Sequence, residues 1–248
     1  MVSFREDYFV QGHHHDRSLW TALNGDRAVK ATALLLLGGV VFFVLVDVVL
    51  RLLDSSDGTA PRMVRRLYIS LSIGRDNSIA ETFNHGMAFF AAILFFAAGA
   101  IVRSRVCLTL AFFMAIAWLD DSSGYHERLG GAFGDRFPDL QAFGVGAAHL
   151  GELVAWLSIG AVLLMLILWS SRRVLPGDRT ALRLTLPPVL LLIVCAVVVD
   201  VVHVPFAGTE LDAAFMYLED GGEMIAIALI ATVALYLARN AESIYGIR

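Results

Sequence analysis

The chain has 248 residues, a formal net charge of −4 and 58% hydrophobic residues, with only 17% charged residues. Soluble globular domains are about 45–50% apolar and about 25% charged, so this composition is that of an integral membrane protein. The acidic balance excludes the basic patch that a nucleic-acid-binding protein would need. Cys107 and Cys195 both lie in apolar runs, which is typical of small buried side chains and not of a disulfide or a zinc pair.

The N-terminal part divides into a polar segment and a first apolar run. Residues 1–30 are polar and we expect them in the cytoplasm, with His13-His14-His15 as part of a solvated tail. Residues 31–53 are apolar and long enough to cross a bilayer core, which needs about 20 residues. Asp47 is the one acidic residue inside this run, and it is predicted to face the interior of a helical bundle.

A long connection, residues 54–86, separates the first apolar run from the second. Large aliphatic residues alternate here with smaller or polar ones, at Leu67, Ile69, Leu71 and Ile73. This period of two predicts a short extended segment at the membrane interface. The arginines just before it, which could contact lipid headgroups, are Arg62, Arg65 and Arg66.

Five further apolar runs follow, at residues 86–102, 106–119, 148–169, 184–204 and 222–237. Only Arg103-Ser104-Arg105 separates the second span from the third, which predicts a tight antiparallel hairpin, and residues 128–147 are expected to be a glycine-rich loop. The sequence therefore predicts an all-α integral membrane protein, a six-transmembrane-helix bundle over residues 31–238, with a short cytoplasmic tail at 239–248. The excess of arginine at one set of span ends, with the lone lysine, Lys30, predicts that both termini are cytoplasmic in a bacterial plasma membrane.

Histidines and acids gather at the opposite set of span ends, which alternation of the spans places at one face of the membrane. Several come in pairs three or four residues apart, a spacing that puts both side chains on one face of a helix: Glu81/His85, His149/Glu152, Asp200/His203 and Glu219/Glu223. Glu-x-x-His motifs on facing helices, with glutamates from other helices, build two-metal sites in helical bundles. Imidazole and carboxylate together suit zinc, iron or manganese.

We therefore expect a divalent metal site at the non-cytoplasmic helix ends, with zinc favoured and iron or copper as alternatives. The expected ligands are His126, His149, Glu152, Asp200, His203, Glu219, Glu223, Glu81, His85 and Asp121. Two other interpretations stay open. The groups could form a metal-free, proton-handling network, because unpaired charges would be costly to bury. They could also be the ordinary polar residues that collect at the level of the headgroups.

Two short motifs resemble those of the alkaline ceramidase-like superfamily of membrane hydrolases. They are Glu81-Thr-Phe-Asn84 at the start of a span and Ser122-x-x-x-His126 after the next. The resemblance implies a zinc ion that activates water for amide hydrolysis, with His126 as a ligand and Ser122 as its helper. The chain departs from that pattern in having six predicted spans instead of seven, and Glu219-x-x-x-Glu223 where the superfamily has His-x-x-x-His.

A second likeness covers most of the chain. The stretches Asp120-Asp121…His126-Glu127 and Glu219-Asp220…Glu223 resemble the DE…HE and EE…E stretches of a family of bacterial multi-span membrane proteins. This likeness implies that the acids and histidines act as one unit, and it implies no particular activity.

The leading functional hypothesis is a polytopic metalloprotein that hydrolyses a lipid or other amphiphile. A bound metal would lower the pKa of its water, and Glu127, with Ser122, would assist as catalytic residues. The alternatives are a redox-active dinuclear metal protein and a non-catalytic accessory subunit of a larger membrane complex. The expected partners are membrane lipids and partner subunits of such a complex, and no nucleic acid.

Overall fold

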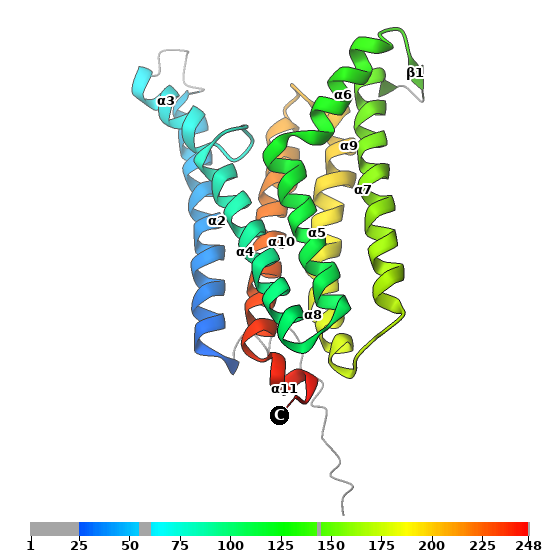
Figure 1. The fold of residues 1–248 in the computed structure, drawn as a ribbon. Coiled ribbons are helices and arrows are strands. Elements are labelled where there is room, and N and C mark those ends of the chain that lie inside the picture. The colour runs from blue at the N-terminus through cyan, green and yellow to red at the C-terminus, as the bar shows by residue number, and fades with distance from the viewer. Residues whose placement is uncertain (1–24, 55–60, 143–144, 248) are drawn as a thin grey trace, which may run out of the picture.

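The computed structural model of the protein describes residues 25–54, 61–142 and 145–247. Within these residues, six helices are long and apolar enough to cross a membrane, so the expected all-α bundle is confirmed at that level (Figure 1). They are α2 (Arg27–Asp54), α4 (Ile79–Val102), α5 (Arg105–Ser123), α7 (Ala147–Ser171), the run of α8 and its extensions (Pro176–Phe206), and α10 (Asp212–Arg239). The histidine run at 13–15 lies outside the described residues.

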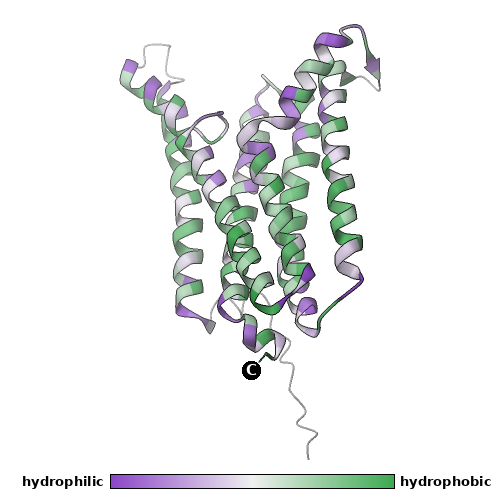
Figure 2. Cartoon of the chain, in the orientation of Figure 1, coloured by the Kyte–Doolittle hydropathy of each residue, from purple (hydrophilic) through white to green (hydrophobic). Residues whose placement is uncertain are grey.

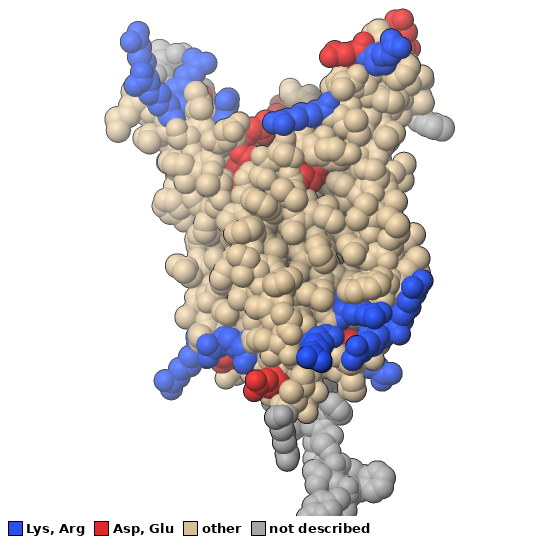
Figure 3. Space-filling model, in the orientation of Figure 1, with Lys and Arg blue, Asp and Glu red and all other residues tan. Residues whose placement is uncertain are grey.

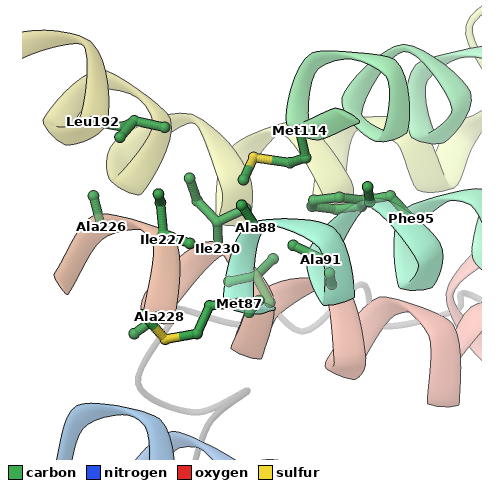
Figure 4. Close-up of a cluster of buried hydrophobic side chains, with 14 of the residues drawn as sticks. Met87, Ala88, Ala91, Phe95, Met114, Leu192, Ala226, Ile227, Ala228 and Ile230 are labelled. Atoms are coloured by element: carbon green, nitrogen blue, oxygen red, sulfur yellow. The ribbon is translucent and has the colours of Figure 1, made fainter. Parts of the chain in front are cut away.

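The six helices form a bundle with α10 at its centre. Helix α10 packs against α4, α8 and α2, and it is the most buried of the six, whereas α2 and α7 lie at opposite sides of the bundle (Figure 1). Side chains from α4, α5, α8 and α10 meet in one apolar core, as around Met87, Phe95, Met114 and Ile230 (Figure 4). Hydrophobic residues fill the middle of the helices and polar residues gather toward their two ends, as a membrane-spanning bundle requires (Figure 2).

The hairpin between α4 and α5 is as tight as expected. Arg103 adopts a left-handed conformation (φ 54°) that ends α4, and the Ser104 hydroxyl accepts a hydrogen bond from the Cys107 amide (3.0 Å) to cap α5. Gly99 permits the close contact, because a Cβ there would lie 3.0 Å from the side chain and backbone of Leu108.

The expected extended segment between the first two spans is wrong, because residues 62–71 form a helix, α3 (Arg62–Leu71). Its inner face carries Val64, Tyr68 and Leu71, which are partly buried while the residues between them are exposed, and α3 packs on α2. Residues 64, 68 and 71 have helical spacing, whereas the aliphatic residues suggested a period of two. The helix forms because it places one face of α3 against α2 and the other toward the solvent or the membrane interface.

The expected glycine-rich loop is likewise partly helical. Residues 125–136 form α6 (Tyr125–Arg136), and the short strands β1 (Gln141–Ala142) and β2 (Val145–Gly146) pair before α7 begins. The glycines serve helix contact here: a Cβ on Gly151 of α7 would lie 2.9 Å from the Gly130 Cα of α6. Small residues thus let α6 and α7 pack backbone to backbone.

The helices also extend past the apolar runs that predicted them. Helix α4 begins at Ile79 and α10 at Asp212, each well before the first apolar residue of the run, so the acidic residues near these ends are part of the helices. Helix α8 (Pro176–Ile193) continues through a π-helical stretch, η1 (Val194–Val199), into α9 (Asp200–His203) and η2 (Val204–Phe206). Single π-turns within helices are frequent at functional sites.

The short helix α11 (Ala241–Tyr245) lies at the end of the bundle where α4 and α10 end and α5 and α8 begin. The carboxylate of Asp178, which is fully buried, accepts hydrogen bonds from the Ser104 hydroxyl (2.5 Å), the Tyr245 hydroxyl (2.8 Å) and the Leu175 amide (2.6 Å). These donors compensate the burial of the carboxylate and join α11, α5 and α8.

Candidate metal site

Acidic side chains lie in a hollow of the molecular surface between the projecting ends of α3 and α6 (Figure 3). The hollow lies at the end of the bundle where α4 and α10 begin and α5 ends (Figure 1). The sequence predicted that the histidines and acids meet at one end of the bundle, and the described residues show that they do.

One group in this layer has the arrangement of a metal site. Ligand-type atoms of Glu81 and His85 on α4 and of Asp121 on α5 all lie within 4.8 Å of one another. His85 Nε2 is 2.9 Å from Asp121 Oδ2 and 3.7 Å from Glu81 Oε1. Glu81 and His85 meet because they are four residues apart on one helix, and the short hairpin brings the end of α5 beside them.

These atoms approach the spacing of ligands that share one ion, although the 3.7 Å from His85 Nε2 to Glu81 Oε1 and the 4.8 Å limit of the group exceed that spacing. Nitrogen and oxygen ligands bind Zn²⁺ at about 2.0–2.2 Å, so two ligand atoms on the same ion lie roughly 3.0–3.6 Å apart in octahedral or tetrahedral geometry. His85 Nε2 is buried and lacks a directed hydrogen bond, even though Asp121 Oδ2 is close enough to accept one. The 2.9 Å contact with Asp121 is an ion-pair distance, so a metal ion bound at His85 Nε2 would replace this contact.

Asn84 adds a buried polar group beside this cluster. It is 7% exposed, and its side-chain oxygen has no hydrogen-bond partner among the described residues. Asn84 is three residues after Glu81, a spacing that makes the two side chains neighbours on α4, and it precedes His85 in the chain. An unpaired buried oxygen is costly, and a cation or its bound water would satisfy it.

Helix α10 brings further carboxylates to the same region. Glu223 is within Coulombic range of Asp121, and also of Asp220, Glu219 and Asp200. Asp220 interacts in the same way with Asp121 and Glu219. The carboxylates of α10 thus connect the Glu81–His85–Asp121 group with the residues of α9.

His203 is held in a way that excludes it as a free ligand. Its Nδ1 lies 2.8 Å from Glu219 Oε2 and its Nε2 lies 2.8 Å from Asp212 Oδ1. Both ring nitrogens of His203 are therefore occupied by carboxyl groups of α10, which leaves neither of them free for a metal ion. His203, which the sequence suggested as a metal ligand, instead joins α9 to α10.

His126 is oriented by a buried carboxylate. Its Nδ1 lies 3.0 Å from Asp120 Oδ2, and its ring packs on Trp156 with centroids 5.1 Å apart, which leaves Nε2 as the nitrogen not used by Asp120. Metal-binding histidines are commonly oriented in this way by a carboxylate. Burial disfavours the charged ring, but the hydrogen bond to Asp120 and the nearby negative charges outweigh it and raise the pKa of His126 above its ordinary value.

The remaining expected ligands form pairs and not a compact cluster. His149 Nδ1 lies 2.9 Å from Glu152 Oε2 at the start of α7, and the His149 side chain is 47% exposed. Asp200 is within Coulombic range of Glu152, His126, His149 and His203, but these atoms do not approach one another as closely as the Glu81 group does within the described chain.

A comparison with protein-family models places this layer within a family. The chain belongs to the family described as a domain of unknown function, DUF8692. Its model matches residues 66–237, which include every candidate ligand from Glu81 to Glu223 and exclude α2. No curated protein and no solved structure matches the chain.

The two residues expected to assist catalysis lie on the surface at the junction of α5 and α6. Ser122 and Glu127 are both exposed, and Glu127 is within Coulombic range of His126. Sequence reasoning named Asn84 only as the end of the Glu81-Thr-Phe-Asn84 motif and not as a candidate ligand, although its spacing from Glu81 could have indicated it. It also left open which of ten candidate ligands meet, because this depends on how the helices are rotated about their axes.

Proposed function

We propose that this membrane protein binds a divalent metal ion through Glu81, His85 and Asp121 and uses it to hydrolyse a lipid or another amphiphile. The observation that carries the proposal is the approach of three ligand-type atoms from two helices to within 4.8 Å, beside a buried and unpaired Asn84 oxygen. Zinc is favoured, with iron or copper as alternatives, because the ligands are one imidazole and two carboxylates.

The chemistry would be metal-assisted hydrolysis. A bound divalent ion lowers the pKa of its water and polarises a carbonyl or phosphoryl oxygen. Glu223, a buried carboxylate of α10 that interacts electrostatically with Asp121, would accept a proton from the attacking water. In such a reaction the water oxygen would form a bond to the acyl carbon or phosphorus as the bond to the leaving group breaks, and Glu223 would give the proton to the leaving group.

We further propose that the site faces away from the cytoplasm, in a bacterial plasma membrane, with both termini inside. Lysine and arginine crowd the opposite end of the described bundle, at Arg27, Lys30, Arg103, Arg105, Arg172, Arg173, Arg179, Arg183 and Arg239. The positive-inside rule assigns that end to the cytoplasm. The site then lies at the outer interface, where an amphiphile has its polar group.

A redox-active dinuclear centre is the second candidate. Glu223 is within Coulombic range of Asp121 on one side and Asp200 on the other, and Asp200 is in turn near His126 and His149. Carboxylates between two sets of histidines are the arrangement of two-metal sites in helical bundles. An accessory subunit without a metal is the outcome if neither candidate binds an ion.

The test is elemental analysis of protein purified in mild detergent without an added histidine tag. The residues His13, His14 and His15 are replaced by alanine in every sample, so that any metal found is bound elsewhere. We expect stoichiometric zinc in this background and its loss in H85A/D121A. H149A, a histidine change in a more exposed pair at the same end, is the matched control and should retain the metal.

Each result has a distinct meaning. Zinc lost only from H85A/D121A supports the proposal and leads to a screen of lipid esters, amides and phosphoesters. Stoichiometric iron or copper supports the redox candidate, and no bound metal in the starting protein rejects both. Metal retained by H85A/D121A but lost from H149A would move the site to α7.

A further inference from the structure

A group of arginines borders the acidic hollow on the side of α2 and α3 (Figure 3). They lie at the end of α2, along α3 and in the connection to α4: Arg51, Arg62, Arg65, Arg66 and Arg75. This end of the bundle carries the candidate metal site and is the end where the positive-inside rule expects fewer basic residues. The concentration of charge beside the site therefore calls for a separate explanation.

Tyr68 of α3 brings two of these arginines together. The guanidinium carbon of Arg51 lies 5.8 Å from the centre of the Tyr68 ring, and that of Arg75 lies 5.5 Å from it. Both distances are within the range of cation–π contacts, which orient a guanidinium without using its N–H donors. The N–H donors of the exposed Arg75 thus stay available for an anion, whereas Arg51 also contacts Asp47 and Met216 and offers only its remaining donors.

Arg51 is fixed on its other side by α2 and α10. Its Nε lies 3.6 Å from the buried Asp47 carboxylate, and its terminal nitrogen contacts the Met216 sulfur at 2.8 Å. The Nε atom is nevertheless buried without a hydrogen-bond partner. Arg51 is also near Asp212 and Tyr217 of α10, so it lies at the same helix that carries the acids of the site.

The connection from α3 to α4 carries Arg75 over α10. A Cβ on Gly74 would lie 2.5 Å from the Met216 sulfur and 3.1 Å from an Asp220 oxygen, so the backbone beside Arg75 touches the helix at the acidic layer. Arg75 itself is exposed, and no carboxylate pairs with it among the described residues. In the same connection, Ser72 is 1% exposed and its hydroxyl has no partner among the described residues.

From this juxtaposition we infer that the site takes an amphiphile with a phosphate in its headgroup, bound by Arg51 and Arg75. The inference rests on the proposed function, whose substrate class it narrows. Guanidinium groups bind phosphate with paired N–H donors, and they stay charged at any working pH. A phosphate held there would place the adjoining ester or phosphoester bond over the carboxylates of α10, toward Glu81, His85 and Asp121.

Binding of short-chain lipids to the full-length protein in detergent tests the inference. The probes are dihexanoyl phosphatidate, dihexanoyl phosphatidylcholine and inorganic phosphate, measured by calorimetry at low salt, because added salt screens such contacts. The variant is R75Q, whose exposed side chain should not be needed for folding. The matched control is R128Q, which removes an exposed arginine from α6 at the same end of the bundle.

We expect the wild-type protein to bind phosphatidate more tightly than phosphatidylcholine or inorganic phosphate. R75Q should raise the dissociation constant for phosphatidate about tenfold, which corresponds to about 1.4 kcal/mol, and R128Q should leave it unchanged. Equal affinity for the two lipids, or an unchanged constant in R75Q, would overturn the inference. Inorganic phosphate bound as tightly as phosphatidate would also overturn it, because the site would then serve free phosphate.

Metal content measured on the same samples separates this inference from the proposed function. Stoichiometric metal without a preference for phosphatidate would reject the inference alone. A preference for phosphatidate that R75Q removes, in protein without metal, would reject the hydrolase and leave a phospholipid-binding protein.

Discussion

The contact between Asp47 and Tyr217 offers a direct test of how the bundle is held together beside the proposed site. The Tyr217 hydroxyl donates a hydrogen bond of 2.6 Å to Asp47 Oδ2, and Asp47 has no exposed surface. The other oxygen of this carboxylate has no partner among the described residues. Replacing Tyr217 by phenylalanine would leave Arg51, at 3.6 Å, as the side chain that compensates the buried charge.

We expect Y217F to be less stable by about 1.5–3 kcal/mol, the usual contribution of a hydrogen bond to a charged group. For a chain of this size, that loss lowers the melting temperature by about 3–12 °C. The assay is thermal unfolding in mild detergent, followed by tryptophan fluorescence. Y68F is the matched control, because it removes a tyrosine hydroxyl near the same arginine without touching Asp47.

A double-mutant cycle decides whether the effect comes from this pair. In a D47N background the carboxylate is neutral, so removing the Tyr217 hydroxyl should cost much less than in the wild type. Equal losses in the two backgrounds, or a Y217F protein as stable as the wild type, would refute the reasoning. Either result would also mean that the Asp47–Tyr217 contact does not help to hold Asp47, and with it Arg51, in place beside the proposed phosphate site.

Two further predictions concern the opposite end of the bundle. G177A should lower the melting temperature, because the new Cβ would lie 2.7 Å from the Tyr245 ring, whereas G160A, with open space around it, should be tolerated; thermal unfolding of both proteins checks this. The Arg239 side chain lowers the pKa of Asp26, so this ion pair stabilises the fold at neutral pH and the contribution is lost as pH falls through the lowered pKa. The difference in melting temperature between the wild type and D26N should therefore be present at pH 7 and vanish in acid, and a constant difference would contradict the assignment.

The number and type of the membrane helices could be predicted from the sequence because an apolar run of about 20 residues has the length of a transmembrane helix and rarely forms anything else. The predictions that were wrong concern segments in which two sequence patterns are both present. In α3, the alternation of Leu67 and Ile69 with smaller residues concealed the helical spacing of Val64, Tyr68 and Leu71. The outcome depended on the presence of α2 as a packing surface, which no local pattern contains.

The second wrong prediction was the glycine-rich loop at residues 128–147. The residues around Gly130 were expected to form a loop because glycine is a poor helix former, yet they are helical and pack against Gly151. Contact between two helix backbones favours glycine as strongly as a turn does. A single sequence does not separate the two uses, since the partner glycine lies on another helix.

The candidate site shows a similar division. Spacing along the chain correctly placed Glu81 and His85 on one face of a helix, and His149 with Glu152. It could not show that Asp121 meets His85 whereas Asp120 meets His126, because adjacent residues point to different sides of α5. Nor could it show that His203 uses both of its nitrogens within the protein.

The start of α10 at Asp212 changes the physical position of the acids that follow. Glu219 lies about two turns inside the helix and Glu223 about three, so these side chains lie below the helix end where the sequence had placed them. Charges within a membrane helix are costly unless they are paired. His203 compensates Glu219, but Glu223 is surrounded by Asp121, Asp220, Glu219 and Asp200. Burial and the neighbouring carboxylates make an ionised Glu223 costly, and a divalent cation at the Glu81–His85–Asp121 group would lower that cost. We therefore expect that chelation lowers the melting temperature of the wild-type protein and leaves that of H85A/D121A unchanged.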